Sequence, residues 1–282
     1  MINKRKPTTP GQRGMSTVSY RNVLTSTKPN KALTRGRKRS VGRNSSGRIT
    51  TPHKGGGVKR LYREIDFKYD KKDIPARVAS VEYDPNRSGF IGLLNYVDGE
   101  KRYVLLPQNV GVGTMLLVSE KAPISIGNRL PLSKIPVGTF VYNIELKENS
   151  GAKIARSAGN YAQVAAQDEG MTHLKMPSSE IRKVSGRAWA SVGEVSNSEH
   201  RLENIGKAGR NRKKGVRPTV RGSAMNAVDH PHGGGEGRQG ISLRRGPKTR
   251  QGKLAYGVKT RRKKKYSNSL IVSRRKTKRG GK

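Results

Sequence analysis

Hydrophobic positions gather in the middle of this chain and are sparse toward both ends. In the middle, short runs rich in Val, Ile, Leu and aromatic residues alternate with turn residues, at a spacing of roughly 8–12 positions that is typical of sandwiches and small barrels. No segment shows a convincing apolar stripe of helical period over a normal helix length. The pattern therefore predicts a mainly β fold.

Two series of strands are predicted. The first series occupies residues 74–83, 90–97, 101–106 and 110–119. Asp98-Gly99 lies between two of these strands and predicts a two-residue hairpin turn, because both residues tolerate positive φ. The second series occupies residues 139–146, 152–155, 161–167, 171–176, 180–184 and 190–195. Between the two series, the Gly- and Pro-containing segment 127–132 is interpreted as a boundary. Trp189 is expected to lie in the core. Residues 198–202 are expected to form a single helical turn.

Charge separates the ends from the middle. Residues 1–63 contain 17 Lys and Arg and no acid, and residues 206–282 contain 25 Lys and Arg and two acids, Asp229 and Glu236. The middle has 18 bases and 17 acids, so the net charge of +41 lies almost entirely in the two flanks. Such flanks repel themselves and have few apolar residues to bury, so we expect them to be irregular and to bind a polyanion.

Several classes of protein are disfavoured. The chain has 282 residues and no cysteine, which excludes disulfides and thiolate zinc sites. No apolar run reaches the ~20 residues that a membrane span needs, and binding to a membrane surface would require an amphipathic helix or an anchor that the sequence does not show. Pro7, Pro10, Gly11 and Gly14 argue against the amphipathic helix of a transit peptide. Nucleic acid is the favoured partner.

The most specific segment is RGSAMNAVDHPHGGGEGR, residues 221–238. Its glycine triplet, Gly233, Gly234 and Gly235, permits close approach of another backbone, and its bare N–H groups can bind phosphate oxygens. The polar and charged side chains suited to RNA are Arg221, Asn226, Asp229, His230, His232 and Arg238. The alternative of a flexible glycine linker gives these fixed side chains no use.

A second glycine triplet lies in the N-terminal flank. Residues 53–60 read HKGGGVKR, so a histidine again precedes three glycines. Neither triplet matches a nucleotide-binding motif, because no Gly-Lys-Ser/Thr follows a strand into a helix. We interpret both as devices for close approach to a sugar–phosphate backbone. In the C-terminal flank, Arg261–Lys265 and Arg274–Lys276 are basic runs of the kind that follow phosphates.

Residues 229–232 offer two chemical alternatives to RNA binding, a general base and a metal site. Asp229 beside His230 suggests a general base, but adjacent residues seldom face each other in an extended loop, and no Ser or Cys nucleophile stands nearby. His230 and His232 alone form an incomplete zinc shell. An acyl transferase centred on His230 would turn over substrate without RNA, and a chromatin-type architectural protein would prefer DNA duplexes to folded RNA.

The motif at 221–238 resembles the signature of the family of large-subunit ribosomal protein two, the universal L-two family of bacterial type. Further motifs follow in family order: KPTTPG (6–11), GGG (55–57), KRLYR (59–63), IDF (65–67), YDPNR (83–87), DGEKRY (98–103), IPVGT (135–139), ARSAG (155–159), GEV (193–195), NSEH (197–200) and GKAGR (206–210). The similarity covers the whole chain, and the family's long-discussed histidine falls on His230. Because KPTTPG at residues 6–11 resembles the family's start, the resemblance implies that no transit peptide is expected.

The resemblance implies a fold and a function. The expected division is a basic N-terminal extension (1–60), an OB-like RNA-binding barrel (61–125), an SH3-like barrel (126–205) and a basic C-terminal extension (206–282). The expected function is that of a structural, non-enzymatic ribonucleoprotein component in translation. It would bind large-subunit rRNA in the cytoplasmic ribosome, near the subunit interface and the peptidyl-transferase region.

The expected partners are rRNA, neighbouring ribosomal proteins and the small subunit, with no membrane and no cofactor beyond Mg²⁺ associated with rRNA. The predicted RNA-binding residues are His53, Lys54, Gly55, Gly56, Gly57, Lys59, Arg60, Arg63, Lys207, Arg210, Arg212, Arg221, Asn226, Asp229, His230, His232, Gly233, Gly234, Gly235 and Arg238.

Overall fold

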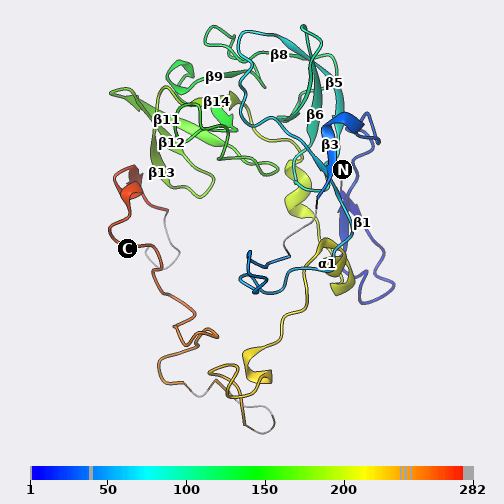
Figure 1. Cartoon of the computed structure of the whole chain (residues 1–282), viewed down its shortest axis with the longest axis vertical. Coiled ribbons are helices and arrows are strands. Elements are labelled where there is room, and N and C mark those ends of the chain that lie inside the picture. The colour runs from blue at the N-terminus through cyan, green and yellow to red at the C-terminus, as the bar shows by residue number, and fades with distance from the viewer. Residues whose placement is uncertain (1, 38–40, 236, 238–239, 242, 276–282) are drawn as a thin grey trace. The chain divides into compact units, whose positions relative to one another are not determined.

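The structure is a computed structural model of the chain, and it describes residues 2–37, 41–235, 237, 240–241 and 243–275. The described residues are mainly β, as the hydrophobic pattern predicts (Figure 1). The chain divides into two compact units. Unit 1 comprises residues 1–39, 59–207 and 267–282, and unit 2 comprises residues 40–58 and 208–266. Each unit is therefore assembled from segments that are distant in sequence.

The first predicted series of strands forms a four-stranded antiparallel sheet in unit 1, in the order β7-β6-β5-β8. Its strands are β5 (Ala76–Glu82), β6 (Ile91–Tyr96), β7 (Lys101–Leu105) and β8 (Met115–Leu116). Gly92 allows this sheet to pack closely, because a Cβ there would lie 2.7 Å from a methyl group of Leu106. The predicted strand 110–119 shortens to β8, since Gly113 adopts a φ of 91°.

The hairpin between β6 and β7 forms where Asp98-Gly99 predicts it, but its turn is longer. Tyr96 donates its N–H to Glu100 O at 2.9 Å, and Gly99 donates to Tyr96 O at 3.0 Å. Of the two turn residues, only Gly99 has a positive φ, of 86°. The Asp98 carboxylate instead accepts a hydrogen bond from the Glu100 N–H at 3.2 Å, which stabilises the turn through a side chain.

The second series forms a seven-stranded antiparallel sheet in the order β15-β13-β12-β11-β10-β14-β9. Its strands are β9 (Arg129–Pro131), β10 (Phe140–Tyr142), β11 (Ala162–Asp168), β12 (Met171–Lys175), β13 (Ile181–Ser185), β14 (Trp189–Val192) and β15 (Ile271–Ser273). Trp189 is buried, as predicted. The predicted strand 152–155 does not form, because Asn143 and Ala155 have φ values of 49° and 53° and leave one bridge between Ile144 and Ile154.

Strand β9 occupies the segment that the sequence suggested as a boundary, and it belongs to the seven-stranded sheet of the second series. Pro131 fits this strand because β9 is the edge strand of its sheet, where the missing N–H of proline is tolerated. Arg129 is only 1% exposed. Its guanidinium donates to Glu145 Oε1 at 2.9 Å and to the Asn143 carbonyl oxygen at 2.7 Å, so burial of the charge is compensated.

The flanks contain short elements that the sequence did not predict. The strands are β1 (Ile2–Lys4), β2 (Ser16–Val18), β3 (Thr34–Gly36) and β4 (Leu61–Arg63). The helices of the flanks are α1 (Ala208–Lys214) and the 3₁₀ turns η1 (Lys31–Leu33), η4 (Gly222–Ala224) and η5 (Tyr266–Asn268). Two further 3₁₀ turns, η2 (Leu132–Lys134) and η3 (Ser198–Leu202), lie in the middle of the chain. Element η3 is the predicted single turn. Strand β3 pairs with β4, and β15 pairs with β13, so both depend on distant partners that a local pattern does not show.

Two hydrophobic cores lie in unit 1. One contains Val78, Leu94 and Val104 beneath the four-stranded sheet, and the other contains Val141, Val164 and other residues of the seven-stranded sheet. Phe67 packs against both cores. Within the described residues, no helix has the length and apolar character needed to cross a membrane.

Candidate nucleic-acid interface

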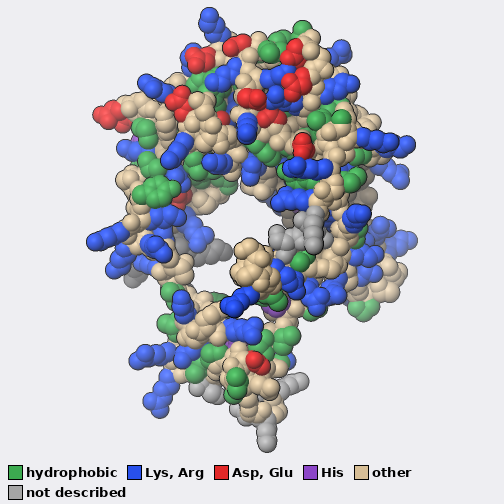
Figure 2. Space-filling model, in the orientation of Figure 1, with side chains coloured by type: hydrophobic (Ala, Val, Ile, Leu, Met, Phe, Trp, Pro, Cys, Tyr) green, Lys and Arg blue, Asp and Glu red, His purple; other side chains and the backbone are tan. Residues whose placement is uncertain are grey.

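Unit 2 is the most strongly basic part of the chain. Its sequence contains 21 Lys and Arg against two acids, Asp229 and Glu236, of which Glu236 lies outside the described residues. Figure 2 shows most of the Asp and Glu side chains of that view on unit 1, whereas the visible surface of unit 2 is rich in Lys and Arg. Unit 2 therefore cannot neutralise itself and offers its charge to an external polyanion.

The first glycine segment is held in place by the chain that follows α1. Gly55 donates its N–H to Gly215 O at 2.9 Å, and Val58 donates to Lys213 O at 2.9 Å. At the other end, Arg217 donates to His53 O at 3.0 Å, and His53 Nδ1 lies 2.9 Å from Pro218 O. Residues 53–58 of one basic flank thus pair with residues 213–218 of the other.

Helix α1 presents basic side chains from this paired region. None of its residues is buried, and Arg210 and Arg212 both lie on it. It ends at Lys214 and is followed by Gly215, whose φ of 94° suits a left-handed helix cap. Val216 donates back to Asn211 O at 3.0 Å, and three basic residues in the last turn complement the negative end of the helix dipole.

The second glycine segment is folded back on itself. Asn226 O accepts hydrogen bonds from the N–H groups of Asp229 (3.0 Å) and His230 (3.2 Å), and Gly234 donates to Met225 O at 3.1 Å. A Cβ at Gly233 would overlap the carbonyl oxygen of Asn226. Glycine at this position is therefore required by the loop itself.

Both histidines of the loop accept hydrogen bonds from backbone N–H groups. His230 Nδ1 accepts from His232 N at 3.0 Å, and His232 Nε2 accepts from Lys248 N at 2.8 Å. An imidazole nitrogen that accepts must be unprotonated, so the geometry assigns the Nε2–H tautomer to His230 and the Nδ1–H tautomer to His232. The rings lie 4.7 Å apart. One N–H donor on each ring is left for a partner.

This arrangement suits neither catalysis nor metal binding. A general base at His230 would use a free nitrogen, but Nδ1 is already occupied by a backbone N–H. Among the described residues, no cluster of three or more His, Asp or Glu could hold a metal ion. In the loop, one nitrogen of each imidazole accepts from the backbone, and the other carries the N–H.

The structure places the predicted RNA-binding residues in both units. Unit 2 contains His53, Lys54, Gly55, Gly56, Gly57, Arg210, Arg212, Arg221, Asn226, Asp229, His230, His232, Gly233, Gly234 and Gly235. The remaining described ones, Lys59, Arg60, Arg63 and Lys207, belong to unit 1. Arg238 lies outside the described residues.

Not every predicted residue is placed alike. Arg60 donates to Pro85 O at 2.8 Å, and Arg63 is only 9% exposed and donates to Leu61 O at 3.1 Å. These two guanidinium groups therefore donate hydrogen bonds within unit 1. Sequence reasoning missed Lys213 and Arg217, whose backbones hold the first glycine segment. The sequence signal was the dense basic run on both sides of Gly215.

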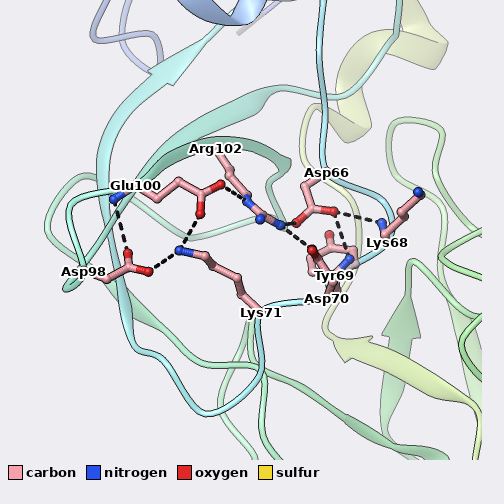
Figure 3. A network of polar contacts seen from close by, with 8 residues as sticks. All are labelled: Asp66, Lys68, Tyr69, Asp70, Lys71, Asp98, Glu100 and Arg102. Carbon is pink, nitrogen blue, oxygen red and sulfur yellow. Dashed lines mark hydrogen bonds and ion pairs between the residues drawn. The ribbon is translucent and has the colours of Figure 1, made fainter.

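A second cluster of charges, on unit 1, is compensated internally (Figure 3). Arg102 donates to Asp66 at 2.9 Å, to Glu100 at 2.6 Å and to Asp70, while Lys71 pairs with Asp98 and Glu100. The hydrogen bond from Arg102 lowers the pKa of Asp70, and that from Lys71 lowers the pKa of Asp98. Four acids facing two bases give this cluster no surplus cation for RNA.

These observations define a class: an RNA-binding β protein with a basic, glycine-containing unit attached to a better-balanced globular part. Residues 30–118 match the family described as Ribosomal Proteins L2, RNA binding N-terminal domain. Residues 125–252 match Ribosomal Proteins L2, C-terminal domain. The chain therefore belongs to the ribosomal protein L2 family.

Family membership confirms the predicted fold class, with an OB-like barrel followed by an SH3-like barrel, and the predicted function class. The protein is a structural component of the large ribosomal subunit in the cytoplasm, has an RNA-binding N-terminal domain, and is not an enzyme. The division into residues 1–60, 61–125, 126–205 and 206–282 stays a prediction, as do the individual RNA contacts.

Proposed function

We propose that unit 2 is the part of this ribosomal protein that enters folded large-subunit rRNA, supporting the geometry around the peptidyl-transferase region and the association of the subunits. The observation that carries the proposal is the pairing of residues 53–58 with residues 213–218 inside a unit with 21 bases. Pairing orders a basic surface before RNA is met, which lowers the entropy lost on binding.

The proposed roles follow from the groups that the protein leaves available. Arg210, Arg212 and Arg221 supply charge for phosphates. His230 Nε2–H and His232 Nδ1–H donate to phosphate oxygens, 2′-hydroxyls or base edges. The chemistry of peptide-bond formation belongs to RNA, and this loop holds local geometry.

Other partners follow the same logic. We infer that Mg²⁺ at this interface is held by rRNA phosphates, because the described residues of unit 2 offer one carboxylate, Asp229. Contacts with the small subunit and with neighbouring ribosomal proteins are part of the proposal, as the setting of a large-subunit protein near the subunit interface.

The test compares two variants with equal net charge. In one, Arg210, Arg212 and Lys213 on α1 become Gln; in the other, the exposed Lys101, Lys175 and Arg187 of unit 1 become Gln. Binding to large-subunit rRNA is measured across salt concentrations. The α1 variant should lose roughly 2–3 from the slope of log affinity against log salt, at roughly 0.7–0.9 per phosphate, and the unit 1 variant much less. Equal losses would mean that only total charge matters and would refute the role of unit 2.

A further inference from the structure

Unit 1 carries two adjoining hollows that RNA binding does not explain. The larger, of about 660 Å³, lies between residues 18–25, 106–112 and 196–199. The smaller, of about 260 Å³, shares Gln108 and Asn109 with it. Four apolar side chains around the hollows are 43–52% exposed: Val23, Val112, Ile126 and Phe140. Exposed apolar side chains that are grouped in this way are typical of surfaces that bind another molecule.

The lining of these hollows carries negative charge, whereas the chain as a whole has a net charge of +41. None of the lining residues is Lys or Arg, and the charged residues of the lining are Glu194 and Glu199. The chain segments 104–119, 135–146, 157–174 and 188–200, which supply most of the surroundings, also contain no Lys or Arg, in a protein that has 60. A surface that binds RNA needs several cations for the phosphates. In the three segments that frame the larger hollow, the one basic residue is the exposed Arg21, and it is not among the lining residues.

We infer that the two hollows form a docking surface for a segment of a neighbouring protein. The segment would be extended, would fill the larger hollow with an apolar side chain, and would bring a Lys or Arg to Glu194. The Glu194 carbonyl oxygen accepts from Gln108 N at 2.8 Å, and its carboxylate makes no ion pair with any described residue. The inference rests on the proposed ribosomal setting, in which this protein has protein neighbours as well as RNA.

A photo-crosslinking amino acid tests what covers the surface in assembled large subunits. It is placed at Val112 or at Phe140 for the hollows, and at Val228, 98% exposed in the second glycine segment, for the RNA-binding unit. From the hollow positions we expect a crosslink to a protein segment that contains both an apolar and a basic residue, identified by mass spectrometry. A crosslink to rRNA, or none while Val228 crosslinks efficiently, would overturn the inference. Because Val228 lies in unit 2, its expected crosslink to rRNA tests the proposed function, and the hollow positions in unit 1 test the docking surface, so the two proposals fail separately.

Charge reversal gives the second readout. Glu194→Lys places a cation against the expected cation of the partner and should reduce the protein crosslink from Val112 at least several-fold. Glu169→Lys, an equal charge change in the turn between β11 and β12, is the control and should leave the crosslink unchanged. An unchanged crosslink in Glu194→Lys would refute the basic segment, and a new rRNA crosslink would show that RNA lies at this face.

Discussion

Arg129 joins the two cores of unit 1 through its buried guanidinium. The group bonds Glu145 and lies 4.3 Å from the ring of Tyr69, which belongs to the core of the four-stranded sheet. Burial raises the pKa of Tyr69 far above its ordinary value, so its hydroxyl stays neutral and accepts from Asn143 Nδ2 at 2.7 Å.

Replacing Arg129 by Met should therefore strongly destabilise unit 1. The change leaves the Glu145 carboxylate buried without its cation, which typically costs about 3–5 kcal/mol. The free energy of unfolding is measured by urea denaturation, with Arg187→Met, at an exposed position, as the control. A loss below about 1 kcal/mol would show that water reaches Glu145 and that the pair contributes little.

His230 is the residue at which structural and catalytic roles predict different results. A Cβ at Gly222 would lie 2.5 Å from its ring, so the imidazole packs on the backbone while accepting from His232. His230→Ala removes this support and should weaken subunit assembly. Large subunits that do assemble completely, verified by protein and rRNA content, should form peptide bonds at close to the wild-type rate in single-turnover assays.

The matched control for His230 is Val228→Ala, which truncates a 98% exposed side chain in the same loop and keeps the backbone bonds of the loop. It should assemble normally. A fall of several orders of magnitude in the peptide-bond rate of fully assembled His230→Ala subunits would instead assign chemistry to this side chain.

At the scale of elements, local patterns predict local structure and miss what depends on distant partners. Asp98-Gly99 locates the hairpin because its signal lies in adjacent residues. Strand β9 was missed because Arg129 and Pro131 look polar and strand-breaking until β14 pairs with them and Glu145 neutralises the arginine. Helix α1 was missed because its seven residues, AGRNRKK, contain no apolar stripe.

The same distinction applies to the candidate site. The two glycine triplets and His230 are visible in the sequence as unusual residue combinations. The pairing of residues 53–58 with residues 213–218 is not visible there, because it joins segments of the two opposite flanks. Nor does sequence show that one nitrogen of each histidine is already used by the backbone.

The ion-pair cluster around Arg102 predicts how stability depends on pH. Hydrogen bonds from Arg102 and Lys71 lower the pKa values of Asp70, Asp98 and Glu100 in the folded protein. Groups with a depressed folded pKa stabilise the fold above their unfolded pKa, which is about 4, and lose this contribution as pH falls through the folded value. The free energy of unfolding should therefore decline below about pH 4.

The variant Arg102→Gln tests whether the acids paired with Arg102 cause this pH dependence of stability. It removes the partner of Asp70 and Glu100, so the decline between pH 5 and pH 3 should become shallower than in the wild type. Denaturant midpoints across this pH range provide the measurement, with Lys175→Gln as a control outside the cluster. Identical pH profiles for Arg102→Gln and the wild type would place the titrating acids elsewhere.

At the scale of the whole molecule, the C-terminal flank is anchored at both ends. Before residue 208, Asn204 exchanges backbone hydrogen bonds with Ser16, and after residue 266 strand β15 pairs with β13. Residues 208–266 thus form a closed excursion from unit 1 and not a free tail. Closing a segment reduces the number of conformations that binding to RNA must select from.

Disrupting the pairing of β15 with β13 should weaken rRNA binding without changing the charge of the protein. Ile271→Pro removes a backbone donor from β15 and disfavours the strand, whereas Ile271→Thr keeps both the donor and the strand propensity. The Pro variant should bind rRNA a few-fold more weakly at every salt concentration, with an unchanged slope of log affinity against log salt, because no phosphate contact is lost. Deleting residues 261–282 would confound the two effects, since it removes β15 together with basic residues. A changed slope in Ile271→Pro, or an affinity equal to that of Ile271→Thr, would show that β15 does not order the excursion for RNA.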